Sequence, residues 1–379
     1  MTATAAKTMR VYFHHTQDTQ LILDLHARGE YPSHFLYGAV ELARQPDMEV
    51  LFDARLAVGQ GKRRGRLWRN TWRILTRQRH FDVLYGTSFN GLELLILLRA
   101  LGLMRRPIAI WHHQPVVTAR SPLREFVARF FYRGIDRMYF FSQPLVAQSL
   151  RSGKVSGQRV QVADWGPELA FYQRFVPCRP APDAPFISTG KEERDMPTLI
   201  EAAGRAGAPL AIYLRKQTGD MDYEHVLGSL HIPACVQVHW TEGQLYGELA
   251  KTVAKARCVV ICCRPTNYTV GLTTLVEAMG LGLPVIATRN RAFPFDIDAE
   301  GMGITVEYGD VAGWERALRW VMSHPAEALR MGERGRQLAE QRFNIRHTAE
   351  QVAAGLRELC TPSPTRGGAV ATQQRREGQ

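Results

Sequence analysis

One segment in the second half of the chain combines residue types that can hold a phosphorylated ligand. It extends from Arg264 to Thr288 and is typical of a strand, a glycine-containing loop, a helix, a turn and a second strand. Gly271 lets the backbone approach a ligand closely, and Thr273 or Thr274 is a good N-cap for the helix. The free N–H groups and positive dipole end of such a helix favour a phosphate group.

Glu277 lies one turn further along the same predicted helix, about 5 Å beyond the expected phosphate position. A carboxylate at that place can accept hydrogen bonds from sugar hydroxyls, as acidic residues do with ribose in dinucleotide-binding folds. The spacing therefore predicts a site for a nucleotide diphosphate. The alternative interpretation is a well-capped helix without a ligand.

The elements around this segment alternate between short apolar runs and helical patterns, which is typical of α/β proteins with parallel sheets. Helical patterns include residues 34–44 and a long region, 326–359, that is broken near Asn344. The alternation stops at Gly166-Pro167 and at four prolines within residues 177–185, because proline continues neither a helix nor a central strand. Two doubly wound domains are therefore expected, with a ligand-binding cleft at the carboxyl ends of their strands.

We expect a basic N-terminal domain at residues 9–165, followed by a linker at 166–185 and a C-terminal ligand domain at 186–340. A closing helix at 341–360 and a disordered tail at 361–379 are expected to follow. The tail is rich in Pro, Gly, Gln and Arg, a composition that disfavours a packed core.

The string from Gly271 to Thr288, GLTTLVEAMGLGLPVIAT, resembles the donor-site signature of retaining glycosyltransferases of the family 4 type. In that family two glutamates, separated by seven residues, precede the stretch Ala-Met-x-x-Gly-x-Pro-Val-Ile. Glu277 matches the second glutamate, which implies that it binds the nucleotide ribose. The first glutamate approaches the donor sugar in the family, and Thr269 occupies its position here.

Two further segments resemble parts of the same family. Residues 186–202 are similar to its first C-terminal-domain loop, where basic residues clamp the diphosphate, and Lys191 and Arg194 fall near those positions. Two cations there would offset the charge that develops on a departing diphosphate. Residues 163–172 are similar to the crossover between the domains, and residues 331–344 are similar to the closing helices.

The resemblance implies a GT-B architecture, in which two Rossmann-like domains face a central cleft, and sugar transfer from a nucleotide-diphosphate sugar with retention of configuration. The implied donor-binding residues are Lys191, Arg194, Asn267, Tyr268, Gly271, Leu272, Thr273, Thr274 and Glu277. The implied catalytic residues are Thr269 and either histidine of the pair His112 and His113, which follows a predicted strand. No metal or other cofactor is implied. The alternatives are a nucleotide-sugar epimerase or hydrolase and a non-catalytic binding module for sugar nucleotides or lipids.

Three other polar groups have simpler interpretations. Asp296-Ile-Asp298 has the form of a metal-binding motif but is interpreted as part of a loop. Asp18 could serve as a base toward an acceptor in an inverting enzyme, although loop aspartates more commonly cap helices. The pair His14-His15 follows the first predicted strand and is a weaker candidate than His112-His113.

Charge is distributed unevenly along the chain. The protein has 48 Lys and Arg against 36 Asp and Glu, a formal net charge of +12. Residues 1–165 contain 24 basic and 12 acidic residues, whereas residues 166–379 contain 24 of each. The excess thus belongs to the half in which this fold places its acceptor, and we expect a lipid-linked or cell-surface glycan there.

Two basic groups in this half suggest contact with an anionic membrane. Arg69, Arg73 and Arg77 are spaced by four and would share one helix face, and five arginines between positions 120 and 137 are interleaved with aromatic residues. The alternative is a solvated basic face, and no nucleic-acid-binding motif is present. The sequence has no paired C-x-x-C spacing and no recognisable signal peptide. We therefore expect a cytoplasmic protein that lies peripherally on the inner face of the membrane.

Overall fold

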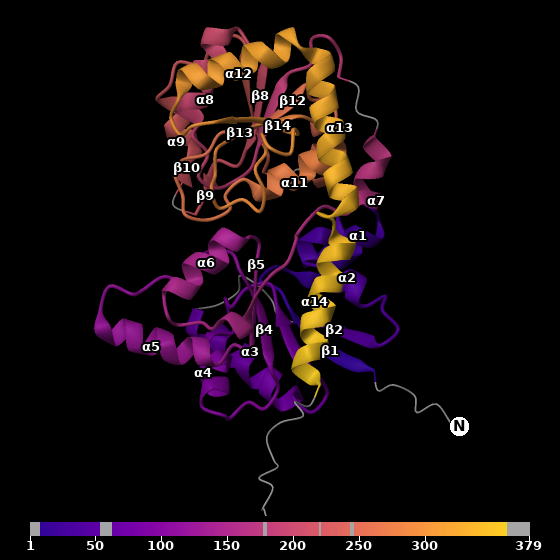
Figure 1. The fold of residues 1–379 in the computed structure, drawn as a ribbon, viewed down its shortest axis with the longest axis vertical. Coiled ribbons are helices and arrows are strands. Elements are labelled where there is room, and N and C mark those ends of the chain that lie inside the picture. The colour runs from indigo at the N-terminus through magenta and orange to yellow at the C-terminus, as the bar shows by residue number, and fades with distance from the viewer. Residues whose placement is uncertain (1–7, 54–62, 177–179, 220, 243–245, 362–379) are drawn as a thin grey trace, which may run out of the picture.

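The computed structural model describes residues 8–53, 63–176, 180–219, 221–242 and 246–361. It has two α/β domains, one above the other in Figure 1, each built on a six-stranded parallel sheet. The predicted α/β class and GT-B-like arrangement are confirmed. The predicted tail lies, apart from Thr361, outside the described residues.

The N-terminal sheet has the strand order β2-β1-β3-β4-β5-β6. Its strands are β1 (Met9–His14), β2 (Met48–Phe52), β3 (Val83–Gly86), β4 (Ile108–His112), β5 (Arg137–Phe140) and β6 (Val160–Val162). The helices of this domain are α1 (Thr19–Ala27), α2 (Ala39–Leu42), α3 (Arg63–Arg77), α4 (Glu93–Ala100), α5 (Pro122–Arg133) and α6 (Gln143–Arg151), with short 3₁₀ turns at Ser33–Leu36 and Gly157–Arg159. Helix α4 packs against both α3 and α5, so these three helices form one layer.

The C-terminal sheet has the order β11-β8-β7-β12-β13-β14, and a small antiparallel hairpin pairs β9 with β10. Its strands are β7 (Phe186–Thr189), β8 (Leu210–Leu214), β11 (Val236–Trp240), β12 (Cys258–Ile261), β13 (Val285–Thr288) and β14 (Gly303–Val306); the hairpin strands are β9 (Gln217–Thr218) and β10 (Met221–Asp222). The helices are α8 (Met196–Ala206), α9 (Tyr223–Gly228), α10 (Tyr246–Val253), α11 (Leu272–Leu281), α12 (Val311–Ser323) and α13 (Pro325–Gln341). Strand β14 and the hairpin were not predicted from the sequence.

The predicted helix at residues 34–44 is wrong, since the chain there forms a 3₁₀ turn and the short helix α2. Tyr37 and Gly38 separate them with left-handed φ angles of 52° and 86°. The Tyr85 hydroxyl donates to the carbonyl of Tyr37 at 2.6 Å, and a Cβ on Gly38 would lie only 3.1 Å from Ala349. Tertiary contacts therefore decide this turn.

The chain crosses between the domains twice, at Asp164 and near Asn344. The first crossing leads into α7 (Leu169–Tyr172) and the 3₁₀ turn Gln173–Phe175. At the second, Asn344 caps α14 (Ile345–Cys360) by accepting from the N–H groups of Arg346 and His347, which accounts for the predicted break. Helix α14 then packs against α2, β3 and β5 of the N-terminal domain.

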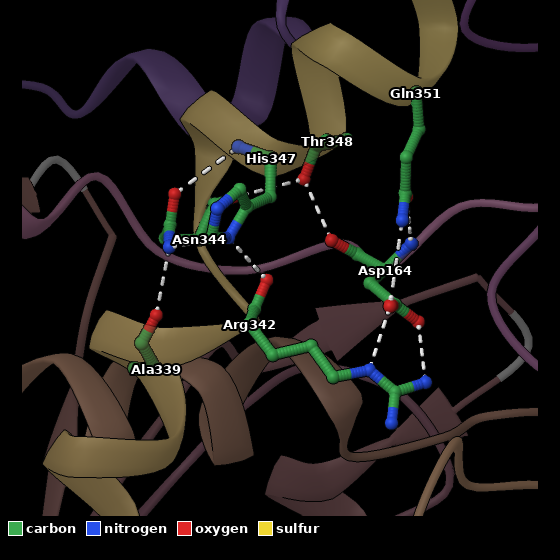
Figure 2. A network of polar contacts seen from close by, with 7 residues as sticks. All are labelled: Asp164, Ala339, Arg342, Asn344, His347, Thr348 and Gln351. Carbon is green, nitrogen blue, oxygen red and sulfur yellow. Dashed lines mark hydrogen bonds and ion pairs between the residues drawn. The ribbon is translucent and has the colours of Figure 1, made fainter.

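A polar network ties the two crossings together (Figure 2). The Arg342 guanidinium binds both carboxylate oxygens of Asp164, at 2.8 and 3.3 Å, and the Thr348 hydroxyl donates to the Asp164 carbonyl at 2.8 Å. The backbones also meet closely, because a Cβ on Gly166 would lie 2.0 Å from the carbonyl oxygen of Phe343. One buried hydrophobic cluster contains residues of both domains, so the domains pack as well as cross.

Candidate functional site

The loop before α11 needs a glycine at its last position. Gly271 has φ 90° and is the N-cap residue directly before α11, which has no side-chain cap. A Cβ there would lie 2.6 Å from Cγ2 of Ile261. Leu272 is buried behind it, and Thr273 is exposed on the first turn. The prediction that Thr273 or Thr274 caps the helix is wrong.

Thr274 is instead one of the partners of a buried arginine. Arg194 is only 3% exposed, and its guanidinium donates to the carbonyls of Thr189 and Glu192, both at 3.0 Å. It also contacts Sγ of Cys263 at 3.2 Å and Oγ1 of Thr274 at 3.1 Å. Arg194 therefore holds the loop between β7 and α8 against α11.

Lys191 has the opposite surroundings. Its side chain is exposed, on the loop that Arg194 supports. Partial burial and the charge of Arg215 lower the pKa of Lys191, whereas the charge of Glu277 acts to raise it, so these three charged groups lie near one another. Arg215, an exposed residue directly after β8, was not identified from the sequence, because no local pattern marks it.

Glu277 lies on α11 at the boundary between the domains. The Tyr246 hydroxyl donates to Oε1 of Glu277 at 2.6 Å and is itself 2.7 Å from the hydroxyl of Tyr172. Burial raises the pKa of Glu277 to about 7, although the Tyr246 hydrogen bond and the charges of Lys191 and Arg194 act to lower it. A proton on this carboxyl is thus readily gained or lost near neutral pH.

Aromatic residues connect Glu277 to the other domain. The Tyr246 ring packs against Tyr31 and Phe35 of the N-terminal domain, with centroids 5.1 and 5.2 Å apart. None of these tyrosines was predicted as a site residue, since residues 31, 172 and 246 come together only through the tertiary fold.

The residues before Gly271 differ in exposure. Asn267 and Tyr268 line an open depression of about 480 Å³ together with Glu193 and Pro265. Thr269, by contrast, is 8% exposed. The Asn290 side chain donates to the Tyr268 carbonyl at 2.9 Å, which fixes the loop in place.

The two histidines after Trp111 point in different directions. His112 is buried inside the N-terminal domain, where its ring stacks on Phe140 at 5.4 Å and lies 5.6 Å from that of Tyr132. Burial lowers the pKa of His112 to about 3. The predicted contact of His112 with a donor sugar is therefore not supported, because strand β4 still includes this residue and turns its side chain inward.

His113 is exposed and faces the C-terminal domain. Its Nε2 lies 2.8 Å from the carbonyl oxygen of Thr87, and its ring packs against Tyr37 and Phe141. Partial burial lowers the pKa of His113, and the negative charge of Glu192, from the opposite domain, acts to raise it. His113 and the loop that carries Lys191 thus come from separate domains and face each other.

The remaining polar candidates have structural roles. His14 and His15 are buried and lie within hydrogen-bond distance of the carbonyl oxygens of Asn90 and Phe35. Asp18 caps α1 by accepting from the N–H of Leu21 at 3.0 Å, as the capping interpretation predicts.

The motif at residues 296–298 belongs to a loop. Asp298 pairs with Arg289 at 2.9 Å, and Asp296 accepts from the N–H groups of Asp298 and Ala299. Among the residues that the structure describes, no group of three or more His, Cys, Asp or Glu side chains could hold a metal ion. In the same part of the chain, no helix is long and apolar enough to cross a membrane.

The chain is similar to known proteins at two levels. Residues 228–338 match the family described as Glycosyl transferases group 1. A stretch of 118 residues is 31% identical to the MMP alpha-(1->4)-mannosyltransferase of Mycolicibacterium hassiacum and covers 31% of this chain and 28% of that protein. The chain thus matches little more than a quarter of that relative's length.

Solved structures share the whole fold at low sequence identity. Sucrose-phosphate synthase from Thermosynechococcus elongatus has a TM-score of 0.65 at 16% identity, over 93% of this chain and 99% of that one. HepE from Anabaena, in complex with UDP-glucose, has a TM-score of 0.62 at 15% identity, over 92% and 100%. The chain therefore has the GT-B fold, and residues 228–338 of its C-terminal domain are similar to the group 1 glycosyl transferases.

Proposed function

We propose that this protein transfers a sugar from a nucleotide-diphosphate sugar to an acceptor, with retention of configuration. The observation that carries the proposal is the convergence of three features at one end of α11: the Gly271 turn, the exposed cation Lys191 and the carboxyl group of Glu277. The match to group 1 glycosyl transferases lies in this domain, and the similar HepE fold was solved with UDP-glucose.

The donor would bind with its diphosphate at the first turn of α11 and beside Lys191. Backbone N–H groups and a lysine are suited to the charge that develops on the departing diphosphate. Glu277 would accept hydrogen bonds from the ribose and exchange its Tyr246 partner for ribose hydroxyls. This assignment needs no metal or other cofactor.

The sugar would then lie between Asn267 and Tyr268 on one side and His113 on the other. Thr269 is buried, so its part would be to set the position of the loop. Arg194 would act as a positioning residue, since most of its N–H donors already bond to the protein. The acceptor would approach from the basic N-terminal domain, and we propose a lipid-linked or cell-surface glycan at the cytoplasmic face of a membrane.

Calorimetric titration with UDP and with GDP tests the donor site. Glu277→Ala is expected to weaken binding of the preferred nucleotide about 10-fold or more, because hydrogen bonds to a charged group contribute roughly 1.5–3 kcal/mol. Glu248→Ala is a matched control, since Glu248 is an exposed acidic residue on α10. Equal affinities for wild type and Glu277→Ala would refute the ribose assignment.

The reaction is tested separately with a panel of nucleotide sugars. If the protein transfers a sugar, release of the nucleotide should occur only when a glycan acceptor is added. Release of the nucleotide at the same rate without an acceptor would instead identify a hydrolase. A change in the sugar of the nucleotide sugar, without release of the nucleotide, would identify an epimerase.

A further inference from the structure

Helix α5 presents apolar side chains to solvent. It has no buried residue, and Leu123, Phe126 and Val127 are 74%, 69% and 50% exposed. Positions i, i+3 and i+4 share one helix face, so these three side chains form a continuous apolar strip. Exposed apolar residues that gather in a patch indicate an interaction site, unlike those scattered singly.

The orientation of α5 is fixed from its other side. Glu125 pairs with Lys154 at 2.8 Å and with Arg129 at 3.0 Å, and it accepts from the N–H of Ala119 at 2.8 Å. Arg124 and Arg133 lie on opposite flanks of the apolar strip, at about 100° per residue around the helix. Both are exposed, and neither forms an ion pair with another described residue.

Helix α3 has a similar outward face. Trp68 and Trp72, one turn apart, are 67% and 72% exposed. Two arginines of the predicted basic stripe on this helix, Arg73 and Arg77, are partly exposed and approach the carboxylate of Asp53 at 3.8 and 3.2 Å. Helix α3 thus presents two indole rings to solvent, beside arginines that are paired with Asp53.

The two apolar groups belong to one layer of the molecule. Helix α4 packs against both α3 and α5, and Figure 1 shows the three helices together on the lower domain, away from the C-terminal domain. We call the exposed side chains Trp68, Trp72, Leu123, Phe126 and Val127, with Arg124 and Arg133, the α3–α5 face.

We propose that the α3–α5 face docks on the surface of an anionic lipid bilayer. Tryptophan and phenylalanine rings suit the boundary between lipid headgroups and acyl chains. Flanking arginines can bind lipid phosphates while the apolar strip enters the bilayer. The first 165 residues supply all of the net positive charge, so charge complementarity favours a lipid surface over a neutral protein partner. The inference rests on the proposed function in one respect, that docking would bring the acceptor side to a lipid-linked glycan.

Vesicle co-sedimentation of the full-length protein, without nucleotide or acceptor, tests the docking. We expect binding to phosphatidylcholine mixed with phosphatidylglycerol, much weaker binding to phosphatidylcholine alone, and loss of binding at high salt. Arg124→Glu and Arg133→Glu should each weaken binding at least roughly fivefold, since a basic residue near such a surface contributes about 1 kcal/mol. The double variant Trp72→Ser/Phe126→Ser should abolish binding.

Leu329→Ser and Arg316→Glu are matched controls on the C-terminal domain, where both side chains are exposed. Equal losses in the controls, or binding that is indifferent to lipid charge, would overturn the proposal. So would a wild-type dimer in size-exclusion chromatography that Phe126→Ser dissociates, because the face would then bind a second copy. UDP titration of the same variants separates the two proposals: docking variants should keep wild-type UDP affinity, and failure of the wild type to bind UDP would count against the donor site alone.

Discussion

The end of α11 and the α3–α5 face present their side chains in opposite ways. At α11 the polar groups are already bonded to one another, as Arg194 is to Thr274 and Tyr246 is to Glu277. On α3 and α5 the large apolar side chains extend into solvent. A rigid site for a small anion is thus formed by internal hydrogen bonds, whereas a surface for a large partner is formed by helix faces that the protein leaves uncovered.

The largest effect is expected at Gly271, where the α11 end has least room. Gly271→Ala should lower the free energy of unfolding by about 3 kcal/mol or more, because it combines a left-handed φ with a contact of 2.6 Å to Ile261. Gly309→Ala is the control, since Gly309 has φ 69° with nothing within 4 Å of the added Cβ, and it should cost only about 1 kcal/mol. Urea unfolding measures both, and equal losses would show that the loop tolerates a side chain.

The two cations near α11, Arg194 and Lys191, should differ in their effects on stability and on ligand binding. Arg194→Ala should lower the free energy of unfolding by about 2–3 kcal/mol, because it leaves several buried partners unbonded. Lys191→Ala should leave stability within about 0.5 kcal/mol of wild type and should weaken UDP binding. Urea unfolding and calorimetry on both variants measure these effects, and the reverse pattern would assign the ligand contact to Arg194.

Glu277 should make stability depend on pH. Its pKa is about 7 in the folded protein against an ordinary value of 4.5, so the folded state binds the proton more tightly than the unfolded state. Stability relative to Glu277→Gln should therefore be greatest below pH 4.5, fall as the pH rises toward 7, and level off above it, a total change of up to roughly 3 kcal/mol. A constant difference between the two proteins across this range would contradict the buried environment of the carboxyl group.

The smallest effect is expected on the α3–α5 face. Phe126→Ser should change the free energy of unfolding by no more than about 0.5 kcal/mol, because the ring is 69% exposed. Phe140→Ser, at a position with no exposure, should cost about 3 kcal/mol or more. If thermal denaturation showed comparable losses, Phe126 would be packed in solution and unable to serve a partner.

The local parts of the site could be predicted from the sequence. Gly271 and Glu277 lie in one continuous strand–loop–helix unit, and their spacing follows from helix geometry. The break at Asn344 could be predicted for the same reason, since a cap is a local hydrogen bond.

The rest depends on tertiary contacts that a sequence pattern does not contain. The burial of Arg194 is decided by Cys263 and Thr274, about 70 and 80 positions away. Whether His112 or His113 faces the other domain depends on the residue at which β4 ends, because consecutive side chains of a strand point to opposite faces. Tyr246 contacts Glu277 through the fold of the C-terminal domain, and it contacts Tyr31 because the two domains meet there.

The network at Asp164 also determines how the domains can move. Because Asp164, Arg342 and Thr348 join both crossings at one place (Figure 2), the two domains share one pivot. A rotation about this pivot displaces atoms in proportion to their distance from it, so the joined crossings move least. The domains are also joined by the Ser142 hydroxyl, which precedes α6 and donates to the Ala292 carbonyl at 2.6 Å. Any rotation of the domains about the pivot therefore acts on this hydrogen bond and on the contacts of Tyr246 with Tyr31 and Phe35.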